Sequence, residues 1–160
     1  MLFKTFLTKQ ETVKMYAFSR SNISFNDAWI IHNFIDIEDE YSIEKAEISI
    51  PNNEHLDYIF VFTLFLSNNN VVPEKLLQDL SYEKFNKLCT VNGIGPALRE
   101  KYFMQKLNKD KRSMFEVFST RVCSISNDVL GGWNSYSCSK YALNIPMKNL
   151  SIEMKRKNLS

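Results

Sequence analysis

Few side chains in this sequence could act as nucleophiles, bases or metal ligands. The three cysteines, Cys89, Cys123 and Cys138, are widely spaced, and the only histidines, His32 and His55, lie far from most of them in sequence. A cysteine nucleophile needs a nearby base, and a zinc site needs paired ligands at short spacing. An odd number of cysteines also gives no disulfide framework. We therefore expect no enzyme, no catalytic residue, no metal site and no cofactor.

An acidic run is the next candidate for chemistry. Asp36, Glu38, Asp39 and Glu40 stand almost side by side. Carboxylates that bind a cation are normally spaced by glycines or other ligands, and this run has neither. Its like charges instead predict an exposed connector that extends to Glu47.

The sharpest short motif runs from Leu88 to Pro96 and contains Gly93 and Gly95. It resembles the hairpin of helix-hairpin-helix modules, in which two glycines let backbone amides approach a phosphate at a helix N-terminus. Arg99 departs from that pattern, because the module prefers a small residue there. The alternative is a junction between two helices that needs glycine for a tight turn.

Charge is distributed unevenly along the chain. Residues 1–80 carry six Lys and Arg against twelve Asp and Glu, whereas residues 81–160 carry fourteen against six. A basic half that also contains Tyr, Trp and Asn is typical of nucleic-acid binding, although ordinary solvated helix faces are the alternative.

Length and composition indicate one folded core. The chain has 160 residues, is 44% hydrophobic and contains only four Gly and four Pro. The apolar run of residues 59–66 is too short to span a bilayer, and no secretory signal opens the sequence. These features predict a soluble protein of a reducing, intracellular or organellar compartment.

Helix-start signals predict a mainly α fold. Capping patterns at Thr8 and Ser24, and further signals at Asn52, Pro73, Ser81, Pro96 and Ser113, predict helices over residues 9–19, 28–35, 55–66, 73–80, 82–90, 96–107 and 113–122. A buried strand is the alternative for residues 59–66, because Phe60, Val61 and Phe62 favour strands. Residues 126–149 are rich in Ser, Asn and Gly and are expected to be extended until a partner orders them.

Three segments resemble the thirteenth small-subunit ribosomal protein family of bacterial-type ribosomes. Residues 46–53 resemble its opening motif, residues 79–85 with 98–107 resemble two of its helices, and residues 136–149 align without gaps to its basic arm motif. Within that arm, the aligned positions are Tyr136, Lys140, Ile145, Pro146 and Lys148. The resemblance implies a helical body with a helix-two-turns-helix-like element and an extended basic C-terminal arm.

The same resemblance implies the function and the binding residues. The protein would be a ribosomal constituent that binds small-subunit rRNA in the head and contacts neighbouring head proteins, with tRNA as a candidate further partner and no membrane partner. The residues expected to bind RNA phosphates are Arg99, Lys101, Lys106, Lys140, Lys148, Lys155, Arg156 and Lys157, and those expected to stack on bases are Tyr136 and Tyr141.

The remaining parts of the chain set its expected organisation. Residues 1–45 have no counterpart in that family and residues 109–135 look inserted, an extension that resembles a mitochondrial ribosomal protein. We expect an N-terminal extension (1–45), a body (46–125) and an arm with a basic tail (126–160). Trp29 and Phe34 are expected in the core, with protein-contact anchors as the alternative. Two other functions stay open, a free-standing DNA-binding module and a protein-interaction factor.

Overall fold

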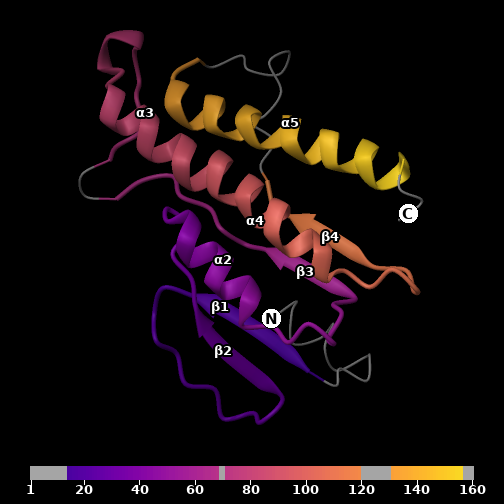
Figure 1. The fold of residues 1–160 in the computed structure, drawn as a ribbon. Coiled ribbons are helices and arrows are strands. Elements are labelled where there is room, and N and C mark those ends of the chain that lie inside the picture. The colour runs from indigo at the N-terminus through magenta and orange to yellow at the C-terminus, as the bar shows by residue number, and fades with distance from the viewer. Residues whose placement is uncertain (1–13, 69–70, 120–130, 157–160) are drawn as a thin grey trace.

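Short parallel strands form two small sheets in the computed structural model, which describes residues 14–68, 71–119 and 131–156 (Figure 1). Strand β1 (Met15–Ser19) pairs with β2 (Ile30–Phe34), and β3 (Tyr58–Val61) pairs with β4 (Met114–Val117). Both pairs are parallel, with Met15 opposite Ile30 and Tyr58 opposite Met114. The described strands therefore form two separate two-stranded sheets.

Two helices begin at side-chain caps. The Asp39 carboxylate accepts a hydrogen bond from the Tyr41 backbone N–H and starts α2 (Glu40–Ile48). The Ser81 hydroxyl accepts one from the Lys84 N–H and starts α3 (Tyr82–Cys89). Such caps satisfy backbone donors that the first helical turn leaves unpaired.

Helix α3 continues without a break into α4. A π-helical turn, η2 (Thr90–Ile94), joins it to α4 (Gly95–Phe103), and the 3₁₀ turn η3 (Met104–Lys106) follows. Another 3₁₀ turn, η1 (Leu77–Asp79), precedes α3. A π turn adds a residue to a helix and changes which side chains face inward.

Helix α5 (Asn134–Arg156) runs beside α3 and α4 and lies at the outer edge of the helix layer in Figure 1. A left-handed turn leads into it, with φ of +65° at Gly131, +76° at Gly132 and +50° at Trp133. Helix α2 packs on α4. The helices therefore form a layer over the strands, with α4 between α5 and α2.

The hydrophobic core lies between α2, α4 and the strands. Its buried members are Ile35, Ile43, Ala46, Ile50 and Phe103. Half-buried side chains from both strand pairs pack against it, including Phe18, Ile59 and Phe115.

The prediction of a mainly α fold is wrong. Parallel strands β1, β2 and β4 lie where three helices were predicted. Each strand is only four or five residues long and shows no clear alternation of buried and exposed side chains, so the sequence gives little sign of a strand there. The strand alternative for residues 59–66 is confirmed in part by β3. The acidic connector is also wrong, since α2 begins at Glu40 and uses Asp39 as its cap.

The predicted extended arm is wrong as well. Residues 134–156 form α5, whose buried side chains pack along α3 and η2 without any partner molecule. The helices predicted over residues 82–90 and 96–107 are confirmed by α3 and α4, whereas residues 73–80 contain only η1. The helix predicted over residues 9–19 lies partly outside the described residues and becomes β1 from Met15 onward. The division at residues 45 and 125 stays a prediction.

Candidate active site

A phenol and an ammonium group are buried together on α5. Tyr136 and Lys140 lie one helical turn apart, with 3% and 0% of their surfaces exposed. Side chains four residues apart share one face of a helix. The Lys140 Nζ lies 5.8 Å from the centre of the Tyr136 ring, and the Trp133 ring meets that ring edge-on at 5.9 Å.

Asn92 brings the π turn η2 into the same cluster. Its side-chain oxygen accepts a hydrogen bond from the Phe65 N–H at 2.8 Å, and its Nδ2 donates to the Phe65 carbonyl at 2.7 Å. The same Nδ2 donates to the Ser139 hydroxyl on α5 at 3.2 Å. Asn92 is fully buried and therefore ties the chain after β3 to the helix that carries Tyr136.

A buried carboxylate fixes the start of α5. Glu74, 1% exposed, accepts a hydrogen bond from the Ser135 hydroxyl, and its backbone carbonyl accepts one from the Trp133 N–H at 2.7 Å. A carboxylate at a helix N-terminus is favoured by the helix dipole. Gly132 permits this approach, because a Cβ there would lie 3.0 Å from the Glu74 carbonyl oxygen.

This cluster can support proton transfer at an oxygen atom. A tyrosine hydroxyl can donate a proton to an oxygen that gains negative charge, or accept one in the reverse direction. A nearby ammonium stabilises the phenolate that forms when the proton leaves. Tyr136 and Lys140 are thus suited to acid–base chemistry on a carbonyl or hydroxyl group.

Gly93 and Gly95 serve helix packing. A Cβ at Gly93 would lie 3.0 Å from the Ala142 Cβ, and one at Gly95 would lie 2.8 Å from the Ile37 carbonyl oxygen. The space a phosphate would need is thus filled by the protein itself. The hairpin interpretation is wrong, and the alternative of a glycine-dependent helix junction describes this segment better.

Three of the predicted RNA-binding cations face groups of the protein itself. Lys106 is 5% exposed, pairs with Glu47 at 3.2 Å and donates to the Ile50 carbonyl and the Asn52 side chain. Lys101 pairs with Glu40 at 2.8 Å. Arg99, 9% exposed, donates to the Thr63 hydroxyl at 2.7 Å.

The other predicted RNA-binding residues do not gather at one place. Lys148, Lys155 and Arg156 are exposed on the second half of α5, and Tyr141 is half-buried. Lys157 lies outside the described residues. Only Tyr136 and Lys140, among the ten predicted residues, are brought into the buried cluster.

Burial and charge pairing shift several pKa values on α4. Burial lowers the pKa of Arg99 to about 10. Burial, with a smaller contribution from Glu153, raises the pKa of Glu100 to about 7. The hydrogen bond between Lys101 and Glu40 raises the pKa of the lysine and lowers that of the carboxyl group.

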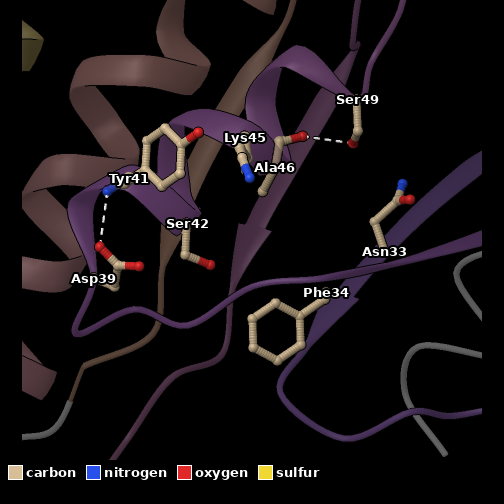
Figure 2. A pocket seen from close by; sticks show the side chains of 8 residues that line it. All are labelled: Asn33, Phe34, Asp39, Tyr41, Ser42, Lys45, Ala46 and Ser49. Atoms are coloured by element: carbon tan, nitrogen blue, oxygen red, sulfur yellow. Dashed lines mark hydrogen bonds between the residues drawn. The ribbon is translucent and has the colours of Figure 1, made fainter.

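Figure 2 shows a separate hollow of about 380 Å³ between β2 and α2. Phe34, which is 60% exposed, borders it, so the prediction of a core position for Phe34 is wrong, whereas Trp29 is half-buried. Several of its polar groups already have partners, because Asp39 caps α2 and the Ser49 hydroxyl donates to the Ala46 carbonyl. The hollow shares no residue with the Tyr136 cluster.

The described part of the chain contains no group of three His, Cys, Asp or Glu side chains able to hold a metal ion. Its helices, α5 included, are each too short or too polar to cross a bilayer.

Solved structures decide the fold. The chain superimposes on a protein from Burkholderia multivorans assigned to the short-chain alcohol dehydrogenases, with a TM-score of 0.80, 17% identity and coverage of 96% of this chain and 70% of that one. It also superimposes on the carbonyl reductase Sniffer of D. melanogaster, with a TM-score of 0.78, 17% identity and coverage of 90% and 65%. The fold is that of the short-chain dehydrogenases and reductases. It is Rossmann-like α/β, with parallel strands.

A third match carries a cofactor. The NADPH-bound carbonyl reductase from chicken fatty liver gives a TM-score of 0.77 at 18% identity, with coverage of 96% of this chain and 69% of that one. No protein-family model and no curated protein matches the sequence.

These matches overturn the ribosomal interpretation. The similar folds belong to short-chain dehydrogenases, so the resemblance to the ribosomal family is wrong. The predicted rRNA and ribosomal-protein partners are therefore wrong as well. The expectation that the chain is not an enzyme is contradicted, because the similar structures are enzymes. The mitochondrial location stays a prediction.

A nicotinamide dinucleotide, the cofactor of such proteins, fits this chain only in part. Arg20 directly follows β1 and is a cation of the kind that accommodates the 2′-phosphate of NADP, but its guanidinium pairs with Glu38 at 3.3 Å. The pyrophosphate normally lies on a G-x-G-x-x-G turn between a strand and a helix. The sequence has four glycines and no such motif, and Gly93 and Gly95 are packed against the protein's own atoms. The residues present do not fit the whole cofactor.

The sequence analysis did not identify Asn92 or Glu74 as site residues, and it did not predict that Tyr136 and Lys140 lie buried on one face of a helix. A signal was present, since Tyr136, Lys140 and Leu143 follow the i, i+4, i+7 pattern of one helix face. The Ser, Asn and Gly content around them suggested an extended segment instead. Asn92 gives no comparable signal, because its burial depends on the π turn.

Proposed function

We propose that this chain carries the substrate side of an oxidoreductase site that interconverts a carbonyl and an alcohol. Tyr136 is the residue that exchanges a proton with the substrate oxygen. The observation that carries this proposal is the joint burial of Tyr136 and Lys140, one turn apart, in a fold shared with carbonyl reductases.

The proposed chemistry follows from charge. Hydride transfer to a carbonyl carbon, for which a reduced nicotinamide dinucleotide would supply the two electrons, builds negative charge on the oxygen, and the Tyr136 hydroxyl donates a proton to that oxygen. The phenolate that remains lies beside the Lys140 ammonium, which stabilises it more strongly in a buried site than in water. In the oxidation direction the same proton moves from the alcohol to Tyr136.

Asn92 and Glu74 act as positioning residues in this proposal. Asn92 holds α5 through Ser139 and holds the backbone after β3 through Phe65. Glu74 holds the first turn of α5 through Ser135. Together they fix the helix turn that presents Tyr136, and neither needs to touch the substrate.

Ligand binding at Tyr136 can be measured through Trp133, whose ring contacts the Tyr136 ring. In a Trp29→Phe background, Trp133 is the only tryptophan. We expect a panel of aldehydes, ketones and secondary alcohols to include compounds that change its fluorescence saturably. Tyr136→Phe should weaken their binding about tenfold, the effect of one lost hydrogen bond.

Tyr141→Phe is the matched control, since it removes a hydroxyl from a half-buried tyrosine on the same helix. It should leave binding within about twofold of the parent. A panel with no saturable response, or an equal response in the Tyr136→Phe and parent proteins, would overturn the proposal.

A further inference from the structure

Two cysteines lie on helices that pack against each other. Cys89 ends α3 and is half-buried, whereas Cys138 lies near the start of α5, between Tyr136 and Lys140, and is exposed. The two helices are in contact, and Figure 1 shows them side by side. Neither thiol takes part in the proposed proton transfer, so a role for this pair is separate from the proposed function.

Contacts farther along these helices show how they are aligned. A Cβ at Gly93, shortly after α3, would lie 3.0 Å from the Ala142 Cβ on α5. The charge of Glu153 on α5 likewise acts on Glu100 of α4. These contacts advance together along both segments, so α3 and α4 run in the same direction as α5.

This alignment brings the two thiols together. Cys89 precedes Gly93 by four residues and Cys138 precedes Ala142 by four, which is about one helical turn in each case. Helices that approach closely at Gly93 and run in the same direction therefore also face each other at the two cysteines. Burial raises the pKa of the Cys89 thiol, and the charge of a Cys138 thiolate raises it further, as expected for neighbouring sulfur atoms.

Both cysteines can be reached by a small molecule. Cys138 is exposed, and Cys89 borders a hollow of about 400 Å³ that Leu80, Tyr82 and Phe85 also line. Tyr82 is 84% exposed, so this hollow opens at the protein surface. Accessible thiols are the ones that oxidants modify, whereas fully buried thiols are inert.

We propose that Cys89 and Cys138 form a redox pair whose oxidation to a disulfide fastens the start of α5 to α3. The oxidant is a small-molecule disulfide such as oxidised glutathione. The Cys138 thiolate attacks one of its sulfur atoms, forms a mixed disulfide and releases the first glutathione thiol. The Cys89 thiolate then attacks the Cys138 sulfur atom, forms the internal disulfide and releases the second glutathione thiol.

The electrons and protons of this exchange balance. Two protein thiols lose two electrons, and one glutathione disulfide gains them and leaves as two thiols that carry the two protons. The exposed Cys138 reacts first, because the raised pKa of the Cys89 thiol leaves it less thiolate at neutral pH.

The disulfide would strengthen a junction that is already present. Ser139, next to Cys138, accepts a hydrogen bond from Asn92 on η2. A covalent bond one turn away ties the same two segments and also restricts the unfolded chain, because it closes a long loop. Oxidation therefore stabilises the protein and holds the helix turn that carries Tyr136.

The test uses the full chain with Cys123→Ser, which leaves Cys89 and Cys138 as its only cysteines. The folded protein is incubated with oxidised glutathione, quenched with acid and analysed by intact mass and peptide mapping. We expect a monomer that has lost two hydrogen atoms, carries no glutathione and yields one cross-linked peptide pair. Its melting temperature should rise by about 5–10 °C and return to the starting value after reduction with dithiothreitol.

The single-cysteine variants Cys89→Ser and Cys138→Ser, made in the same background, are the matched controls. Each should take up at most one glutathione and melt at the same temperature in oxidised and reduced glutathione. The thiol that remains in Cys89→Ser should react faster than the one in Cys138→Ser, because Cys138 is the exposed thiol.

Incubation in urea separates a fold-dependent pair from two independent thiols. The internal disulfide should form faster in native buffer than in urea, because the folded helices hold the two thiols together. Stable glutathione adducts on both cysteines, disulfide-linked dimers in place of the internal bond, or a bond that forms only in urea would each overturn the proposal.

Discussion

The helical half and the strand half of this protein differ in how complete they are. In the helical half, α3, η2, α4 and α5 enclose Asn92, all of whose amide groups have partners, and bury Tyr136 and Lys140 beside it. In the strand half, which includes α2, two short parallel pairs share a core with that helix but are not joined by a common ladder among the described residues. The groups that we propose to act on a substrate are thus assembled in one half, while the other half contains only part of what a dinucleotide site needs.

The largest expected effect tests the link between the two halves. Lys106→Met removes the ammonium that pairs with Glu47 of α2 and leaves that carboxylate buried without its charge partner. We expect a loss of about 3–5 kcal/mol in the free energy of unfolding, measured by urea denaturation. Lys101→Met is the matched control, because its ion pair with Glu40 is solvent-exposed, and its unfolding midpoint should stay close to the parent's. Equal midpoints for the two variants would show that the halves are not joined through Lys106.

The next effect measures packing within the helical half. Leu143→Ala empties a position that is 2% exposed on α5 and should cost about 2–5 kcal/mol of unfolding free energy. Ile145→Ala, two residues later at 65% exposure, should cost less than about 0.5 kcal/mol. Similar losses for both variants in thermal and urea unfolding would contradict the packed position of α5.

The smallest expected effect has a pH dependence with a defined sign. The pKa of Glu100 is raised from 4.5 to about 7 in the folded protein, so folding binds a proton between these values and stability falls as the pH rises through 7. Both carboxylate oxygens lack hydrogen-bond partners among the described residues. Glu100→Gln should therefore stabilise the protein by about 2 kcal/mol at pH 8 and have little effect below pH 4.5.

Glu153→Gln is the matched control for that change. The negative charge of Glu153 raises the pKa of Glu100 by less than burial does. Glu153→Gln should therefore stabilise the protein at pH 8 by less than Glu100→Gln does. A Glu100→Gln variant with the same unfolding curve as the parent at both pH values would rule out a buried ionised carboxylate there.

Local signals predicted the helices that carry their own caps. Ser81 correctly marks the start of α3, and Pro96 lies in the first turn of α4. These features depend on a few neighbouring residues and so can be recognised in the sequence. The strand former Phe60 likewise indicated β3 as an alternative.

The rest depends on contacts between distant segments. Strands β1 and β2 are half-buried along nearly their whole length, which hides the alternation that marks a strand. Tyr136 and Lys140 were among the predicted functional residues, but their aromatic and basic chemistry was assigned to RNA because α5 was expected to be extended. The role of Asn92 depends on three segments that are distant in sequence. Its side-chain amide, on η2, bonds both to the backbone after β3 and to Ser139 of α5.

Pro146 divides α5 into two parts with different mechanical roles. The buried side chains of the helix all lie before it, from Ser135 to Leu143, whereas the residues after it are half-buried or exposed. A proline inside a helix removes one backbone hydrogen bond and weakens the connection across that turn. The C-terminal turns of α5 can therefore bend, fray or engage a neighbouring molecule while the turn that presents Tyr136 keeps its orientation.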